Sequence, residues 1–153
     1  YRLSEAETDD MVRGTNVHNI VEYFWDYAPD KIDETLSLID DGKELLAKDL
    51  MYSVIPKPPK PYLLGEEEII RQWFDWQWDR FLVTRGVNWA AKGNEVSAHA
   101  LIHVEVDGEE YPVHLRGFID TIFSDGEGGF VLMELKTGKW KQKKTAKKCN
   151  ITD

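Results

Sequence analysis

The sequence predicts a domain of the α/β or α+β class, because two different patterns of apolar residues divide the chain. Over residues 9–85 the apolar residues recur at helical spacing, whereas over residues 96–136 they alternate with polar residues or form short runs. The proline-rich stretch at 55–62, IPKPPKPY, interrupts the helical half and cannot be a regular helix. Helices followed by closely spaced strands indicate an antiparallel meander flanked by helices.

Three helices are expected in the first half. The first covers 9–27, where Thr8 or the next residue can cap it, apolar residues recur at helical spacing, and Pro29 ends it. The second is expected over 30–48. The third begins near residue 66, where three glutamates suit the positive end of the helix dipole, and it ends before Gly86. Its aromatic residues Trp73, Phe74 and Phe81 are expected in the core, with Trp76 and Trp78 pointing elsewhere.

Three strands are expected in the second half. Residues 96–106 alternate apolar and polar side chains, as a half-buried strand does. Asp107-Gly108 is a strong hairpin-turn signal. One long strand bent at a glycine is expected over 110–123, a loop over 124–129, and a last strand over 130–136. Three histidines lie on neighbouring strands, but no clearly placed further ligand completes a zinc site, so we interpret them as solvent-facing: His99, His103 and His114.

Length and composition exclude several classes of protein and of site. The chain has 153 residues, so we expect one domain over 1–153. No apolar stretch approaches the roughly 18–20 residues that span a bilayer, so no membrane segment is expected. The single cysteine, Cys149, cannot form an internal disulfide, a cysteine-based zinc site or an iron–sulfur cluster. A reducing, intracellular (cytoplasmic) setting is the expectation that follows.

The net charge of −9 at first argues against a nucleic-acid partner. Its distribution reverses the argument, because residues 136–153 hold seven of the 19 basic residues and one of the 28 acidic ones. A basic segment therefore follows the last expected strand directly. Either it is a solvated terminus or it binds nucleic acid.

The last expected hairpin brings three chemically useful side chains together. Folding the chain about Glu127 places Asp120 opposite Glu134, and cross-strand partners have Cβ atoms about 4.5–5.5 Å apart. Lys136 lies two residues beyond Glu134 and so shares its face of the sheet. Two carboxylates and one ammonium group are thus expected to meet.

The surroundings of these groups predict a cation. Both strands are apolar on their two faces, so we expect them to be covered on both sides, where an unpaired carboxylate costs several kcal/mol. A divalent cation would offset the repulsion between Asp120 and Glu134, and hard oxygen ligands select Mg²⁺ or Mn²⁺ rather than zinc. The alternative is a buried ion pair of Lys136 with one of the carboxylates.

Two segments carry a resemblance to a known family. RGFID at 116–120 and VLMELKTGKW at 131–140 resemble motifs II and III of the PD-(D/E)XK nuclease superfamily, especially its RecB-like exonuclease branch. RGTNVHNIVEYF at 13–24 is similar to the N-terminal helical motif of that branch, with a glycine, His18 and Glu22 in register. By itself, a His/Glu pair at this spacing is also an ordinary contact on a helix surface.

The resemblance implies a restriction-endonuclease-like core, with a central mixed sheet, and a Mg²⁺- or Mn²⁺-dependent nuclease that hydrolyses DNA, single- or double-stranded. It assigns Asp120, Glu134, the carbonyl of Leu135 and His18 to the metal. It assigns Lys136 to the attacking water and the phosphate charge. Further residues are implied to support the ligands or contact substrate: Glu22, Glu95, Thr137 and Lys139.

One departure from the branch leaves other functions open. Its members carry a Gln and a Tyr on a helix after the E-x-K strand, whereas here Gln142 is followed by no tyrosine, so we expect that helix to be incomplete. The leading function is an exonuclease of DNA repair, recombination or viral DNA processing. The alternatives are a catalytically inactive nucleic-acid-binding or assembly module on the same scaffold, and an interaction domain that uses Trp76 and Trp78 as a contact surface.

Overall fold

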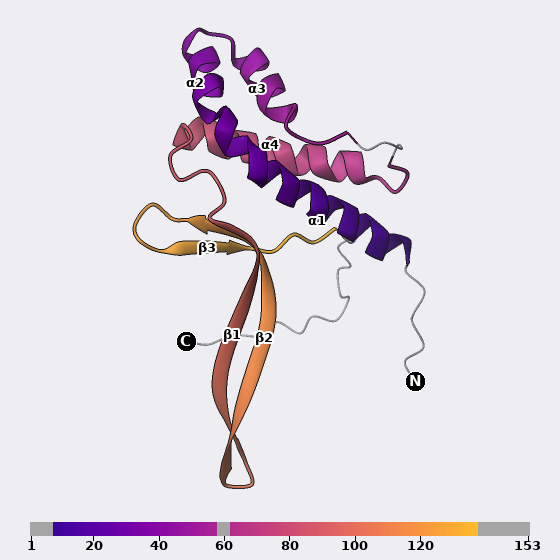
Figure 1. Ribbon diagram of the computed structural model, residues 1–153, viewed down its shortest axis with the longest axis vertical. Coiled ribbons are helices and arrows are strands. Elements are labelled where there is room, and N and C mark those ends of the chain that lie inside the picture. Colours follow the sequence, from indigo (N-terminus) through magenta and orange to yellow (C-terminus); the bar gives the residue numbers. More distant parts are fainter. Residues whose placement is uncertain (1–7, 58–61, 138–153) are drawn as a thin grey trace, which may run out of the picture.

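A computed structural model describes residues 8–57 and 62–137 (Figure 1). Helices occupy the first half of the chain and strands the second, as expected of an α+β domain. The elements are α1 (Asp9–Tyr27), the 3₁₀ helix η1 (Ala28–Lys31), α2 (Ile32–Asp40), α3 (Glu44–Tyr52), α4 (Glu66–Thr84), β1 (Gly93–Val106), β2 (Glu109–Ser124) and β3 (Phe130–Met133).

Two of the three expected helices are confirmed. Helix α1 has the predicted bounds, and the hydroxyl oxygen of Thr8 accepts a hydrogen bond from the backbone N–H of Met11 at 3.3 Å, as an N-cap does. Helix α4 also follows the prediction, and it ends where Arg85 adopts a left-handed conformation with φ of 51°.

The prediction of one continuous helix over 30–48 is wrong. It is divided into η1, α2 and α3. The break between α2 and α3 lies at Gly42, whose φ of +76° no helix interior allows. The N–H of Gly42 donates to the carbonyl of Ile39 at 3.0 Å and that of Lys43 to the carbonyl of Leu38 at 2.8 Å, which satisfies the free carbonyls at the end of α2.

Aromatic side chains fill the core between the helices and the base of the sheet. Figure 1 shows α1 and α4 side by side, above the strands. The rings of Phe24 and Trp25 on α1 pack edge to face against Trp73 on α4, with centroids 5.1 and 6.0 Å away. Trp25 also packs against Phe123 on β2 at 5.5 Å. These contacts fix α1 against the sheet.

The expectation that Trp78 points away from the core is wrong. Its side chain is only 3% exposed and stacks on Phe81 at a centroid distance of 5.4 Å. Trp78 lies four residues after the buried Phe74, so it continues the same apolar stripe of α4. Trp76 does lie outside, 47% exposed, with the Arg80 guanidinium 5.4 Å from its ring centre.

The sheet is antiparallel in the order β1-β2-β3. Its register matches the prediction about Glu127, since Thr121 pairs with Met133 and Ser124 with Phe130. Strand β3 nevertheless ends at Met133, three residues before the predicted end at residue 136. The expected mixed sheet is also not found over the described residues, where all strand pairs are antiparallel.

Strands β1 and β2 form a long two-stranded ribbon that projects from the helical body (Figure 1). The expectation that the inner strands are covered on both faces is wrong, since Phe118, Phe130 and Leu132 are 61–70% exposed. The helices cover only the base of the ribbon, where Thr121 and Phe123 are buried. The three histidines of the ribbon are exposed, as the sequence predicted.

Among the described residues, none of the helices has the length and apolar character that crossing a bilayer requires.

Candidate metal centre

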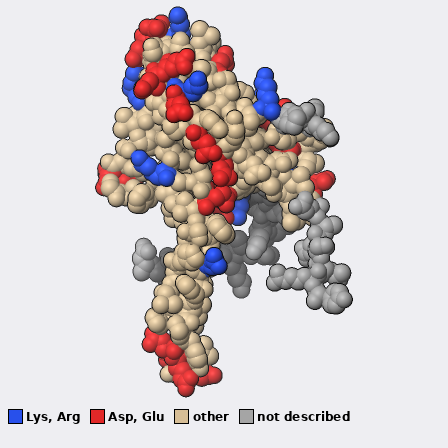
Figure 2. Space-filling model, viewed as in Figure 1, with Lys and Arg blue, Asp and Glu red and all other residues tan. Residues whose placement is uncertain are grey.

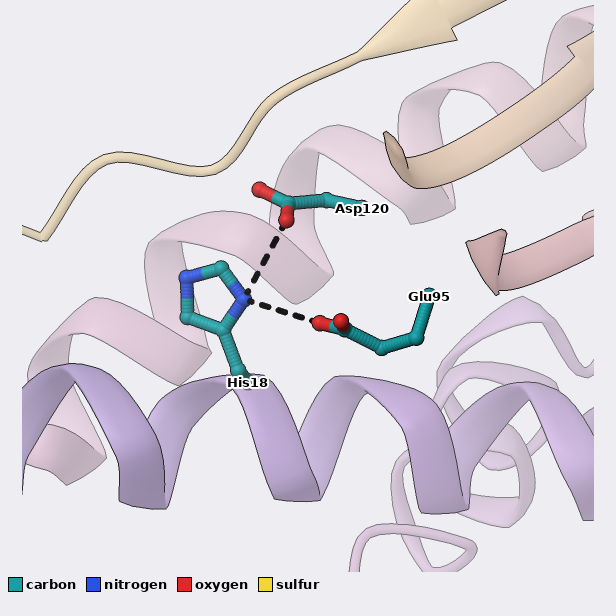
Figure 3. Close-up of side chains that lie close together, drawn as sticks. All are labelled: His18, Glu95 and Asp120. Carbon is teal, nitrogen blue, oxygen red and sulfur yellow. Dashed lines mark ion pairs between the residues drawn. The ribbon is translucent and has the colours of Figure 1, made fainter. Parts of the chain in front are cut away.

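Helix α1 presents His18 to the base of the sheet. The flanking Val17 and Val21 are buried in the core, which holds α1 in place and turns the histidine toward the strands. Figure 3 shows the imidazole rising from α1 toward the carboxylates of Glu95 and Asp120. Its Nδ1 lies 3.7 Å from Glu95 Oε1 and 3.7 Å from Asp120 Oδ1.

These three side chains have the donor atoms and the spacing of a cation site. One ligand atom from each of His18, Glu95 and Asp120 lies within 4.8 Å of the others. Ligands bound to Mg²⁺ at about 2.1 Å lie about 3–4 Å from one another, so a small contraction of the cluster suffices. An imidazole nitrogen with two carboxylate oxygens suits a divalent cation.

Glu95 reaches the cluster through an unusual backbone conformation. Its φ of 48° lies in the left-handed region, which non-glycine residues seldom adopt and which costs about 1–3 kcal/mol. The flanking pairs, Asn94 with Thr121 and Val96 with Ile119, set Glu95 opposite Asp120. Two carboxylates on neighbouring strands are therefore held on one side of the ribbon, close to His18.

The segment after β3 orients both His18 and Asp120. The N–H of Leu135 donates to Asp120 Oδ2 at 2.8 Å, and the carbonyl oxygen of Leu135 lies 3.1 Å from His18 Nε2. A carbonyl can only accept, so Nε2 must carry the proton. In the neutral ring Nδ1 is then unprotonated, and its lone pair is available on the side of the carboxylates.

Glu134 and Lys136 lie outside this cluster. Glu134 Oε1 and Lys136 Nζ form an ion pair at 2.8 Å, with side chains 69% and 78% exposed. The ion pair that the sequence left open is thus present, at the surface rather than buried. The hydrogen bond to Glu134, then its charge and that of Asp120, raise the pKa of Lys136 above its ordinary value.

A small cavity of about 10 Å³ lies at the cluster, lined by His18, Asn94 and Asp120 among others. Asn94 Oδ1 is buried, and it has no hydrogen-bond partner within the part of the chain that the structure describes. Because a buried polar atom without a partner costs about 1–3 kcal/mol, its position in the cavity wall favours a polar occupant.

A wider groove of about 550 Å³ opens beside the cavity along α1. Its lining residues are Gly14, Thr15, His18, Asn19, Glu22 and Glu95. The Thr137 Oγ1 atom lies 3.3 Å from where a Cβ on Gly14 would be, so the glycine lets the chain after β3 pass close to α1. Of the residues implied by the resemblance, Glu22 lines the groove, and Thr137 lies next to Gly14. Lys139 and Gln142 lie outside the described residues.

Sequence reasoning gave Glu95 little weight, although a signal for it was present. Folding the chain about the Asp107-Gly108 turn places Glu95 opposite Asp120. The same argument, applied to the turn about Glu127, places Glu134 opposite Asp120 on its other side. The contribution of Asn94 had no such signal, because its burial depends on packing.

A family model of the PD-(D/E)XK nuclease superfamily matches residues 1–150. The chain belongs to this superfamily. No curated protein and no solved structure matches it. PD-(D/E)XK proteins are in general metal-dependent nucleases, and helices packed on an antiparallel sheet agree with their restriction-endonuclease-like core. The His18–Glu95–Asp120 cluster gives this PD-(D/E)XK chain a group of residues that fits a divalent metal.

Proposed function

We propose that the protein is a Mg²⁺- or Mn²⁺-dependent nuclease that hydrolyses DNA phosphodiester bonds. The observation that carries the proposal is the convergence of ligand atoms from His18, Glu95 and Asp120 within 4.8 Å, in a chain of a nuclease superfamily. The similarity of the two sequence motifs to the RecB-like branch supports an exonuclease, acting in DNA repair, recombination or viral DNA processing.

The metal is proposed to be held by His18 Nδ1, Asp120 and Glu95, with Glu134 as a further ligand. The carbonyl of Leu135, which the resemblance assigned to the metal, lies at Nε2 on the other side of the imidazole ring, so it is proposed to orient His18 rather than to bind the ion. A bound Mg²⁺ or Mn²⁺ lowers the pKa of its water and neutralises charge that develops on the phosphate. Leu135 fixes the ring of His18 and the carboxylate of Asp120 through its backbone carbonyl and N–H. Glu134 joins this set only if its carboxylate leaves Lys136, which its exposed position permits.

Lys136 is proposed to act as a cation rather than as a base. Its pKa is raised by the hydrogen bond and charge of Glu134 and by the charge of Asp120, so the ammonium group keeps its proton at neutral pH. It can then donate hydrogen bonds to the attacking water or to a phosphate oxygen, and it offsets negative charge there. The groove along α1 offers neutral hydrogen-bonding groups, Thr15 and Asn19, beside His18 and Glu95.

Incubation of the purified protein with labelled single- and double-stranded DNA and Mn²⁺ tests the proposal. We expect shortening of the DNA by the wild type and its loss in Asp120→Asn and Lys136→Ala. Glu110→Ala is the matched control, because this glutamate is exposed on β2 far along the ribbon, at the pair with Glu105 next to the hairpin turn. Inactivity of the wild type, or full activity of Lys136→Ala, would contradict the proposal.

A second candidate is a nucleic-acid-binding or assembly module that no longer cleaves. The surface ion pair between Glu134 and Lys136 favours it, since both groups are engaged with each other. Calorimetric titration with Mn²⁺ separates the two functions. A nuclease must take up the ion at His18, Glu95 and Asp120, whereas a module that only binds nucleic acid has no need to.

A further inference from the structure

The side-chain amide of Asn94 belongs to the candidate metal centre but has no role in the set of three ligands. Its Oδ1 is buried, and over the residues that the structure describes this oxygen has no hydrogen-bond partner. Asn94 also lines the cavity of about 10 Å³ that His18, Glu95 and Asp120 share. Because buried amide oxygens are nearly always satisfied, the occupant of this cavity is the expected partner of Oδ1.

The backbone at Glu95 explains how two neighbouring residues of β1 reach one cavity. Consecutive residues of a strand ordinarily point to opposite faces of the sheet. The pairs on either side of Glu95 keep the regular register, Asn94 with Thr121 and Val96 with Ile119. The φ of 48° at Glu95, however, departs from extended geometry and breaks the alternation of side chains. Both Asn94 and Glu95 can therefore line the cavity.

The side-chain atoms that these four residues offer to an occupant are all acceptors. Ionised carboxylates and amide oxygens only accept hydrogen bonds, and His18, with its proton on Nε2, presents a lone pair at Nδ1. A water molecule donates two hydrogen bonds, so it would leave two of the four residues without a partner. A cation satisfies all four. The cavity has about the size of one water, so an ion that contacts the cluster also lies next to Asn94.

We propose that Asn94 Oδ1 is a fourth protein ligand of the metal centre, in addition to the histidine and the two carboxylates. Amide oxygens of asparagine are ligands of hard divalent cations in proteins. Four protein ligands leave two positions of an octahedral cation open for water and a phosphate oxygen. This inference rests on the proposed function and adds a ligand to its metal centre.

A neutral ligand suits a site that receives a phosphate. The charges of Glu95 and Asp120 are balanced by one divalent cation, and Asn94 adds none. Figure 2 shows acidic side chains gathered in a column over the middle of the molecule, and the net charge of the chain is −9. A third carboxylate at the ion would add to the repulsion of an anionic substrate. With Asn94 as the fourth ligand, Glu134 can stay paired with Lys136.

Calorimetric titration with Mn²⁺ of variants at position 94 tests the inference. For Asn94→Ala we expect the dissociation constant for Mn²⁺ to rise about ten- to a hundredfold. Asn94→Asp keeps an oxygen in the same place and should bind Mn²⁺ at least as tightly as the wild type. Gln72→Ala is the matched control, because it removes an exposed amide from α4 and should leave the affinity unchanged. Melting temperatures in EDTA verify folding, and Asn94→Ala should melt close to the wild type, since Oδ1 has no partner to lose among the described residues.

The outcomes separate this inference from the proposed function. If the wild type binds Mn²⁺ and Asn94→Ala binds it equally well, Asn94 is not a ligand, whereas the metal centre and the nuclease proposal stand. An equal loss of affinity in Asn94→Ala and Asn94→Asp also overturns the inference, because it assigns Asn94 to packing. A wild type that takes up no Mn²⁺ overturns both proposals.

A crystal structure of the wild type with Mn²⁺ gives a reading that needs no variant. An Asn94 Oδ1 about 2.1–2.3 Å from the ion supports the inference. An ion bound to His18, Glu95 and Asp120 with Asn94 Oδ1 more than about 3 Å away overturns it and leaves the metal centre intact.

Discussion

His18 and Leu135, which are 117 residues apart in the chain, meet through a 3.1 Å contact between Nε2 of the imidazole and the backbone carbonyl. The carbonyl fixes the proton on Nε2 and thereby turns the lone pair of Nδ1 toward Glu95 and Asp120. One backbone group thus selects the tautomer that can bind a cation. Since Leu135 N–H also holds Asp120, the segment after β3 organises two of the three candidate ligands.

Replacement of His18 tests this arrangement. In His18→Ala the cluster keeps two carboxylates but loses its nitrogen ligand, and we expect Mn²⁺ affinity measured by calorimetry to fall at least tenfold. His99→Ala is the control, because this histidine is exposed on β1. Equal Mn²⁺ affinity of His18→Ala and the wild type would show that the imidazole is not a ligand.

The backbone of Glu95 predicts a conflict between stability and metal binding. Glycine tolerates the φ of 48° at this position, whereas alanine does not, so Glu95→Gly should be more stable than Glu95→Ala by about 1 kcal/mol. Both variants lack the carboxylate and should lose most of the rise in melting temperature that Mn²⁺ gives the wild type. Chemical denaturation measures the first effect and thermal melting with and without Mn²⁺ the second. A Glu95→Ala variant at least as stable as Glu95→Gly would argue against backbone strain here.

The contact between Gly14 and Thr137 predicts that a stabilising change in α1 damages the site. Alanine at position 14 improves helix propensity by about 1 kcal/mol, but its Cβ would lie 3.3 Å from Thr137 Oγ1 and push the segment after β3. We expect Gly14→Ala to melt no lower than the wild type while binding Mn²⁺ more weakly. Adding Thr137→Ala removes the hydroxyl and should restore Mn²⁺ binding. If the double variant binds as weakly as the single one, crowding at Thr137 is not the cause.

The ion pair of Lys136 with Glu134 gives a prediction on pH. The pKa of Lys136 is raised chiefly by its hydrogen bond to Glu134, so Glu134→Gln should lower it toward the ordinary value near 10.4, as measured by NMR titration. Because the pKa of Lys136 is higher in the folded than in the unfolded protein, its protonated side chain stabilises the fold. This stabilisation is complete below about pH 10.4 and is lost as the pH rises through the raised pKa. Because both side chains are exposed, we expect the change in stability to be small. An unchanged Lys136 pKa in Glu134→Gln would contradict the pairing.

The uneven burial of the ribbon predicts where substitutions are costly. Phe123 is 3% exposed and packs on Trp25, so Phe123→Ala should lower the free energy of unfolding by about 3–5 kcal/mol. Phe118 is 70% exposed on the same strand, and Phe118→Ala should cost less than about 1 kcal/mol. Urea denaturation compares the two. Similar losses would mean that something covers the ribbon at Phe118.

Local signals in the sequence were enough to place Asp120. Hairpin turns fix register, so the turn about Glu127 correctly predicted how β2, which carries Asp120, pairs with β3. Helical spacing placed His18 on α1. The end of β3 could not be foreseen, because the N–H of Leu135 bonds to the Asp120 carboxylate instead of continuing the strand. Glu134 consequently lies beyond the ladder, where alternation no longer determines its direction.

Tertiary features account for the other differences. Whether an apolar strand is covered depends on how far the helices extend over the sheet, which no local pattern at Phe118 reveals. Trp78 was misplaced because two neighbouring apolar stripes on α4 both face the core. The division of the second helix did have a local signal in Gly42, whose positive φ stops α2.

The most direct test of the account is a crystal structure of the protein soaked with Mn²⁺, with the ion located by anomalous scattering. We predict one manganese peak about 2.1–2.3 Å from His18 Nδ1 and from carboxylate oxygens of Asp120 and Glu95. A peak at other residues, or a soaked crystal with no manganese at these three side chains, would contradict the proposal that they form the metal centre of a nuclease.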